Sequence, residues 1–192
     1  MLKHNLIIKS FERNFWESPE QIAGLGTGAI GGKAKGLVFI NDVVEKLFPE
    51  GSFSGIEVKI PKMVVLRTDV FDAFLKENNL DQIAYSNLPD ERIAHAFQKA
   101  VLPFNILGDL RALIAGVKSP LAIRSSSLLE DAMYEPFAGV YASKMTPNNQ
   151  HDTETRFNKL VEAIKYVYAS TFFKAAKDYI KATKHKVVEE KM

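Results

Sequence analysis

Apolar residues recur at helical spacing along several stretches of the chain, and these stretches predict helices. The first begins at Lys33 and is ended by Pro49-Glu50-Gly51, a sequence that breaks helices. One face of this helix carries Leu37, Ile40, Val44 and Leu47. Shorter patterns predict helices over 69–75, with Thr68 as a cap, over 90–101 and over 105–116. After Pro147 the chain contains neither Gly nor Pro, so the segment from Asp152 onward is predicted to form a long helix or two stacked ones.

Three shorter apolar runs predict strands. Residues 63–66 follow Pro61 and are apolar throughout, as in a buried strand. Residues 121–123 follow Pro120 and lead directly into Arg124, and residues 140–145 form a third candidate with imperfect alternation. Because helices outnumber strands and interleave with them, the pattern favours a helix-rich α/β fold, with α+β as the alternative.

The composition is typical of a soluble globular protein, with 192 residues, of which 46% are apolar and 25% charged. The absence of cysteine excludes disulfide frameworks, thiolate nucleophiles and thiolate metal sites, and it favours a reducing cytoplasm. No apolar run is long enough to span a membrane, and residues 1–16 lack the apolar core of a signal peptide. A net charge of +2 does not by itself indicate a nucleic-acid partner.

A glycine-rich stretch occupies residues 24–33, and residues 26–31 match the pattern G-x-G-x-x-G. We do not interpret it as a dinucleotide-binding fingerprint, because residues 18–21 are turn-like and no buried strand is predicted before it. It is not a P-loop either. That motif needs a glycine where Thr27 stands and a Ser or Thr where Ala34 stands.

Gly31 and Gly32 nevertheless lead into a helix whose first turn carries Lys33 and Lys35. Unpaired backbone N–H groups, the positive end of the helix and a lysine together favour a bound anion. The alternative is a solvated turn with two surface lysines.

A second polar segment begins at Arg124, which follows a short apolar strand and is expected to face a polar cleft. A guanidinium group can donate to two phosphate oxygens at once. The residues that would assist it are the hydroxyl donors Ser125, Ser126 and Ser127, the acids Glu130 and Asp131, and Gly139, which allows close backbone approach. The acids would hold the arginine or lie near a metal. The alternative is a polar loop with an internal salt bridge.

Taken together, these motifs resemble those of a known family. The segments Gly31-Gly32-Lys33, the strand after Pro61, Arg124-Ser125-Ser126, Glu130-Asp131 and Phe137-Ala138-Gly139 resemble the N-terminal ATP-binding (PEP/pyruvate-binding) domain of phosphoenolpyruvate synthase and pyruvate phosphate dikinase. Their order and spacing match over roughly residues 20–180. The chain departs from the family pattern at Ser127, Leu128, Pro136 and Val140, where the family has Ala, Thr, Ser and Gln.

The resemblance implies that Lys33 and Arg124 contact the phosphates of ATP, supported by the loop residues named above. It implies an ATP-grasp-type cleft, with the Mg²⁺ ligands and a Gln beyond residue 192. Residues 1–192 would then be the N-terminal part of a longer enzyme, without a catalytic residue or metal site of their own and inactive in isolation. Apolar surface left uncovered by a missing lobe would favour self-association.

The resemblance also implies the reaction. The parent enzyme would move phosphate from ATP to a histidine and then to pyruvate, giving phosphoenolpyruvate, AMP and phosphate. Its phosphohistidine and pyruvate-binding domains would be the partners of this chain. A related enzyme with another acceptor, such as a glucan or an antibiotic, is one alternative. A non-catalytic regulatory module that binds nucleotide is another.

Two minor features are interpreted structurally. One face of the last predicted helix carries Lys174, Lys177, Lys181 and Lys184, and we predict a solvated face rather than a nucleic-acid surface. No His, Asp and Glu cluster has the spacing of a metal site, and no serine lies in the sequence context of a catalytic triad.

Overall fold

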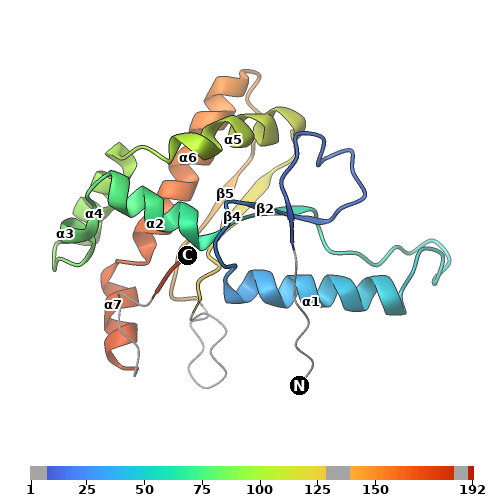
Figure 1. Ribbon diagram of the computed structural model, residues 1–192, viewed down its shortest axis with the longest axis horizontal. Helices are drawn as coiled ribbons and strands as arrows, with labels where there is room; N and C mark the ends of the chain where they lie inside the picture. The colour runs from blue at the N-terminus through green and yellow to red at the C-terminus, as the bar shows by residue number, and fades with distance from the viewer. Residues whose placement is uncertain (1–7, 129–138, 184–189) are drawn as a thin grey trace.

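The computed structural model describes residues 8–128, 139–183 and 190–192. Within these ranges the chain forms a three-stranded parallel sheet, a two-stranded antiparallel ribbon and helices α1 to α7 (Figure 1). The predicted mixture of helices and strands, with helices in the majority, is confirmed. No helix in the described ranges is long and apolar enough to cross a membrane.

The parallel sheet has the order β1-β2-β3, with β1 at Lys9–Ser10, β2 at Ile22–Leu25 and β3 at Met63–Leu66. Its central strand β2 is buried along all four residues. Helix α1 (Gly32–Leu47) connects β2 to its parallel neighbour β3, as a crossover between parallel strands requires. The predicted strand at 63–66 is therefore confirmed, and it lies at the edge of this sheet.

Strand β2 corrects one of our predictions, because a buried strand does precede the glycine-rich stretch. The strand is only four residues long and includes Gly24 and Leu25, which we had counted as part of the loop. So short a segment has no readable periodicity, and its burial comes from β1 and β3, which pair with it from elsewhere in the chain.

The other helices surround the main hydrophobic core. They are α2 (Thr68–Glu77), α3 (Asp81–Ala84), α4 (Asp90–Lys99), α5 (Phe104–Gly116), α6 (Thr153–Ser170) and α7 (Lys174–Lys181). Phe71, Phe74, Phe97 and Phe172 are almost fully buried at its centre. Phe74 and Phe97 meet edge to face with their ring centroids 5.7 Å apart, a favourable aromatic geometry.

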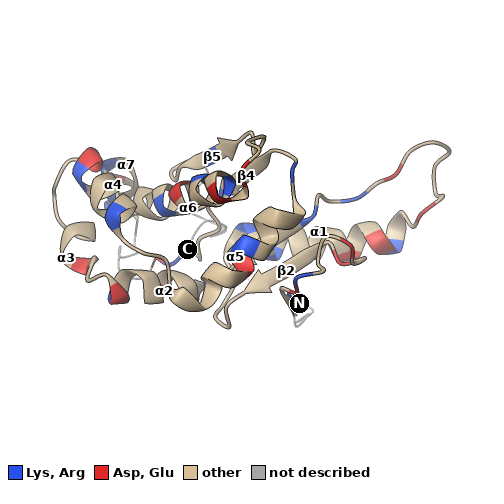
Figure 2. Ribbon diagram, turned by 90° about the horizontal axis from the view of Figure 1, so that it is seen from above, with Lys and Arg blue, Asp and Glu red and all other residues tan. Residues whose placement is uncertain are grey.

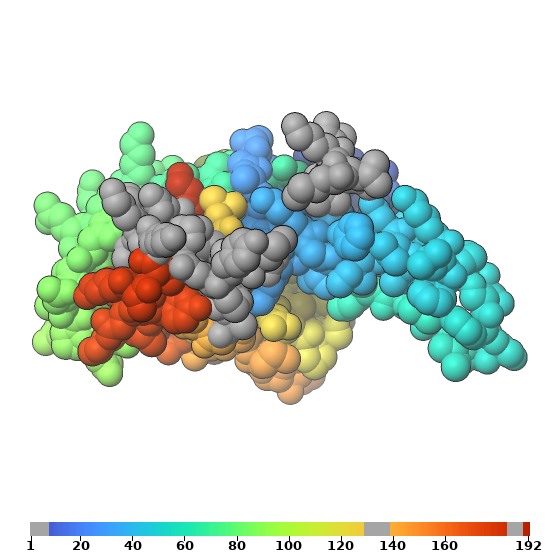
Figure 3. All heavy atoms as spheres, turned by 90° about the horizontal axis from the view of Figure 1, so that it is seen from below, coloured from blue at the N-terminus to red at the C-terminus, as the bar shows by residue number. Residues whose placement is uncertain are grey.

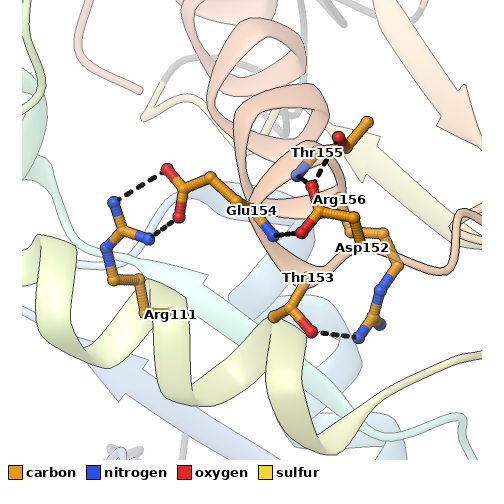
Figure 4. Close-up of polar contacts among 6 residues, drawn as sticks. All are labelled: Arg111, Asp152, Thr153, Glu154, Thr155 and Arg156. Carbon is orange, nitrogen blue, oxygen red and sulfur yellow. Dashed lines mark hydrogen bonds and ion pairs between the residues drawn. The ribbon is translucent and has the colours of Figure 1, made fainter.

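Helix α6 begins at a well-defined cap (Figure 4). The Asp152 carboxylate accepts hydrogen bonds from the backbone N–H groups of Glu154 and Thr155. The Thr155 hydroxyl also donates to this carboxylate and, with those amides, holds the pKa of Asp152 below its ordinary value. Glu154 pairs with Arg111 of α5, an exposed ion pair between the two helices. Beyond Asp152 we had predicted a long helix or two stacked ones, and the structure has two helices, α6 and α7.

The predicted lysine face of α7 is wrong at one position. Lys177 is buried, and its ammonium group donates to the backbone carbonyl of Ser86. Lys174 and Lys181 both pair with Asp178, and Lys184 lies outside the described residues. A lysine can satisfy its charge at a buried carbonyl, so helical spacing alone did not distinguish it from its exposed neighbours.

The antiparallel ribbon is formed by β4 (Leu121–Arg124) and β5 (Ser143–Thr146), separate from the parallel sheet. Arg124 occupies the last position of β4, opposite Ser143, rather than a position after the strand. The predicted strand at 140–145 forms, but it is displaced toward the C-terminus. We had expected Arg124 to follow a strand at the edge of an α/β sheet. That expectation is wrong, because Arg124 lies within a strand of the separate ribbon.

Helix α1 forms where predicted, but its predicted apolar face is not the buried one. Ala34 and Val38 are buried, whereas Ile40 is 47% and Leu47 is 66% exposed. A helix of 16 residues is about 24 Å long, but a strand of four residues spans only about 13 Å. The second half of α1 therefore extends beyond the sheet, and with the segment that follows it forms a projection at one end of the molecule (Figures 2 and 3).

Candidate functional site

The two segments singled out in the sequence lie against each other at the start of α1. We call residues 26–31 the glycine loop and residues 125–128 the serine loop. The backbone N–H of Gly32 donates to the carbonyl oxygen of Ser127 at 2.8 Å, and the N–H of Ala34 donates to the hydroxyl of Ser126 at 3.0 Å. The serine loop therefore caps the helix that the glycine loop begins.

Gly31 is the point of closest approach between the two loops. A Cβ atom at this position would lie 1.5 Å from the carbonyl oxygen of Ser126, so a larger residue cannot fit without moving the backbone. The same packing corrects one expectation. The amides of Gly32 and Ala34 are not free for an anion, because the serine loop has already paired them.

The three serines are more enclosed than a set of exposed hydroxyl donors. Ser125 and Ser127 are buried, and the Ser126 hydroxyl accepts from the amide of Ala34. Their contribution to phosphate binding stays a prediction. Gly139 has φ +76°, a left-handed conformation that favours glycine. Glu130 and Asp131 lie outside the described residues.

Lys33 contacts the residue that follows Arg124 in the chain. The Lys33 ammonium group is 3.4 Å from the hydroxyl of Ser125, although Lys33 and Ser125 are 92 positions apart in the chain. Ser125 directly follows Arg124. Arg124 is exposed, and no hydrogen bond or ion pair among the described residues engages its guanidinium group. The first turn of α1 contains no acidic residue. Lys33 therefore lies at the positive end of α1, beside the serine loop.

Comparison with protein families places the chain. Residues 27–192 match the family described as pyruvate phosphate dikinase, AMP/ATP-binding domain. The chain belongs to this family. Comparisons with curated proteins and with solved structures gave no match. The resemblance inferred from the motifs is confirmed, and membership supports nucleotide binding as the function of this domain.

In this member of the family the glycine loop is held by Asp69, a residue that sequence reasoning missed. Its carboxylate accepts from the N–H groups of Thr27 and Gly28, each at 2.8 Å, and from the Thr27 hydroxyl at 3.1 Å. Partial burial acts to raise the pKa of Asp69, but these hydrogen bonds outweigh it and the pKa lies below its ordinary value. Asp69 appeared in the sequence only as an early residue of a predicted helix, and nothing local indicates a partner some forty positions away.

Thr68 also belongs to this contact, which corrects its predicted role as a helix cap. Helix α2 begins at Thr68 itself, and no side chain caps it. The Thr68 hydroxyl instead accepts from the backbone N–H of Ala29 at 3.1 Å. The residue before it, Arg67, donates to the carbonyl oxygens of Gly28 and Ile8.

The serine loop is also held by residues near the C-terminal end of the chain, a contact that the sequence did not indicate. The N–H of Leu128 donates to the carbonyl oxygen of Lys191 at 3.0 Å, and the Lys191 ammonium group pairs with Asp72 of α2 at 2.6 Å. The adjacent Glu190 is buried and accepts from the hydroxyl of Tyr141. The described C-terminal residues thus connect the serine loop to α2.

The described residues do not supply a magnesium site. They contain no group of three or more His, Asp or Glu residues that could hold a metal ion. Both carboxylate oxygens of Asp69 accept hydrogen bonds from the glycine loop.

Proposed function

We propose that this chain is the ATP-binding portion of a phosphotransferase similar to phosphoenolpyruvate synthase, and that Lys33 and Arg124 contact the ATP phosphates. The observation that carries the proposal is the contact between Lys33 and Ser125, which joins the start of α1 to the residue that follows Arg124. Membership of an AMP/ATP-binding family supplies the ligand class.

The chemistry of phosphoryl transfer suits such a pair of residues. The protein contributes mainly positioning and charge stabilisation, because the phosphoryl group itself undergoes the bond changes. A guanidinium group donates two parallel hydrogen bonds to phosphate oxygens, whereas an ammonium group acts as a compact point charge. Arg124 would therefore orient a phosphate, and Lys33 would neutralise its charge from the start of α1.

The remainder of the reaction belongs to the same proposal. ATP, pyruvate and water would give phosphoenolpyruvate, AMP and phosphate, with phosphate carried by a histidine of a separate domain of the parent protein. An ATP-grasp-type cleft and Mg²⁺ would complete the site. No described residue is assigned to that metal ion, and no step is derived through it. A cysteine-free sequence fits a cytoplasmic enzyme.

Nucleotide binding tests the proposed phosphate contacts. We expect Lys33→Ala and Arg124→Lys each to weaken ATP affinity, measured by calorimetry, roughly ten- to a hundredfold, since a charge-assisted bond to phosphate contributes about 1.5–3 kcal/mol. Lys46→Ala at the opposite end of α1 and Arg92→Lys on α4 are matched controls that should bind as the unaltered chain does. ATP binding that is unchanged in both site variants, with circular dichroism showing intact folds, would refute the assignment.

The proposed division of labour between domains is tested separately by AMP release. We expect the purified chain to release no AMP when supplied with ATP, Mg²⁺ and pyruvate, because the described residues offer neither a metal site nor the sequence context of a phosphohistidine. Clear pyruvate-dependent turnover by this chain alone would contradict the proposed division of labour between domains.

A further inference from the structure

The start of α2 contacts both loops of the candidate site. Asp69 accepts three hydrogen bonds from the glycine loop, and Asp72, three positions later on the same helical face, pairs with Lys191. The carbonyl oxygen of Lys191 in turn accepts from Leu128 at the end of the serine loop. One helix turn is thus linked to both polar segments, although it contributes no group to the phosphate contacts proposed above.

The contact with the glycine loop is the more extensive of the two. Over three consecutive loop residues, the N–H groups of Thr27 and Gly28 donate to Asp69, and that of Ala29 donates to Thr68. In return, the N–H of Thr68 donates to the carbonyl oxygen of Ala29 at 3.0 Å. These amides are paired within the chain, so they do not bind phosphate in the manner of a P-loop.

The packing around Asp69 also requires the glycines of this loop. Gly26 has φ +93°, and a Cβ on it would lie 2.5 Å from a carboxylate oxygen of Asp69. A Cβ on Gly28 would lie 2.6 Å from the backbone nitrogen of Asp69. The loop therefore follows the surface of the α2 start at a distance that only glycine allows.

We infer that Asp69 is a positioning residue for the nucleotide site, acting through the glycine loop on Lys33. This inference rests on the proposed function. The loop ends at Gly31, directly before the helix that carries Lys33, so the path fixed by Asp69 sets where that helix begins. The Lys33 ammonium group then lies beside Ser125, next to Arg124. The negative charge of Asp69 thus positions Lys33 without contacting the phosphate.

Amide hydrogen exchange measured by NMR tests the first step. In Asp69→Ala we expect the amides of Thr27 and Gly28 to exchange at least tenfold faster, because their acceptor is removed. Asp69→Asn keeps one acceptor oxygen, so exchange of these amides should be faster than in the unaltered chain and slower than in Asp69→Ala. It also provides a second variant if Asp69→Ala folds poorly. Asp81→Ala removes an exposed acid from the first turn of α3 and should leave both amides unchanged. Unaltered exchange at Thr27 and Gly28 in both Asp69 variants would overturn the inference.

A double-mutant cycle on ATP affinity tests the second step. We expect Asp69→Ala alone to weaken ATP binding about tenfold, but to cost less than twofold when added to Lys33→Ala, because its effect passes through that lysine. Ile93→Val, a modest core deletion in α4, should leave the affinity unchanged and thereby separates positioning from general loss of stability.

The outcomes distinguish this inference from the proposed function. Independent, multiplicative losses in the double variant would show that Asp69 does not act through Lys33, in a chain that still binds ATP as proposed. Absence of ATP binding by the unaltered chain would instead contradict the proposed function itself, and with it any role of Asp69 at a nucleotide site.

Discussion

The two faces of the parallel sheet are covered to very different depths. On one face, Ala23 and Leu25 of β2 and Val64 and Leu66 of β3 join the main core, which α2, α4, α5 and α6 enclose. On the other face, the alternate residues of β2 and β3 belong to a smaller cluster of seven buried residues, to which α1 contributes Ala34 and Val38. The sheet thus has a thick layer on one side and half of a single helix on the other (Figure 1).

Because of this difference, the residues that contribute most to stability are not those of the candidate site. The thick layer holds the tightly packed aromatic residues, whereas the glycine loop, Lys33 and the serine loop meet at the N-terminal end of α1. The thin layer is therefore secured at that end by hydrogen bonds and close backbone contact rather than by a broad apolar interface. Substitutions should consequently have unlike effects on the two sides.

The largest effect is expected in the thick layer. Phe74 is fully buried and contacts Phe97 and Tyr168, so Phe74→Ala should lower the free energy of unfolding by about 3–5 kcal/mol. Phe104→Ala is the matched control, because Phe104 is 89% exposed at the start of α5 and should cost less than about 0.5 kcal/mol. Urea denaturation followed by circular dichroism measures both, and equal losses would mean that the core is assigned incorrectly.

A smaller effect is expected where the thin layer meets the serine loop. Gly31→Ala should lower the free energy of unfolding by about 1–3 kcal/mol and weaken ATP binding, because its Cβ would collide with the backbone of Ser126. Gly36→Ala, in the same helix with nothing within 4 Å of its Cβ, should instead add about 0.5–1 kcal/mol. The same denaturation experiment compares them, and a Gly31→Ala variant as stable as Gly36→Ala would argue against the described contact.

The smallest effect on stability is expected at the overhanging end of α1. Ile40→Gln and Leu47→Gln should change the free energy of unfolding by less than about 0.5 kcal/mol, because both side chains are already exposed. The same variants should reduce any self-association of the chain, measured by light scattering, since contiguous exposed apolar surface promotes it. A monomeric unaltered chain at high concentration would refute the predicted self-association.

Much of the fold could be predicted because its helices are long and regularly patterned. Helices α4 and α5 lie within a few residues of their predicted bounds, and α6 begins next to its predicted start, since apolar residues at helical spacing identify them locally. The face of α1 that is buried could not be predicted in this way. Val38 and Ile40 are both apolar, and only the position of a short sheet determines which of them is covered.

The sequence predicted which segments form the candidate site, but not how they contact each other. Glycines before a lysine and an arginine before serines are local signals, and both segments do meet in the structure. The pairing of Gly31 with Ser126 and the role of Asp69 depend on contacts across many intervening residues. Propensity and periodicity contain no information about such contacts, so the sequence identified the segments and not the residues that join them.

The cap that the serine loop provides for α1 also bears on the order of folding during synthesis. The helix emerges from the ribosome early, but the acceptors for its first amides are Ser126 and Ser127, which are added more than ninety residues later. At about 5–20 residues per second, the delay is roughly 5–20 seconds. A nascent chain therefore carries α1 with an unfinished N-terminus for that time, and Lys33 and Ser125 can come together only after most of the domain has been translated.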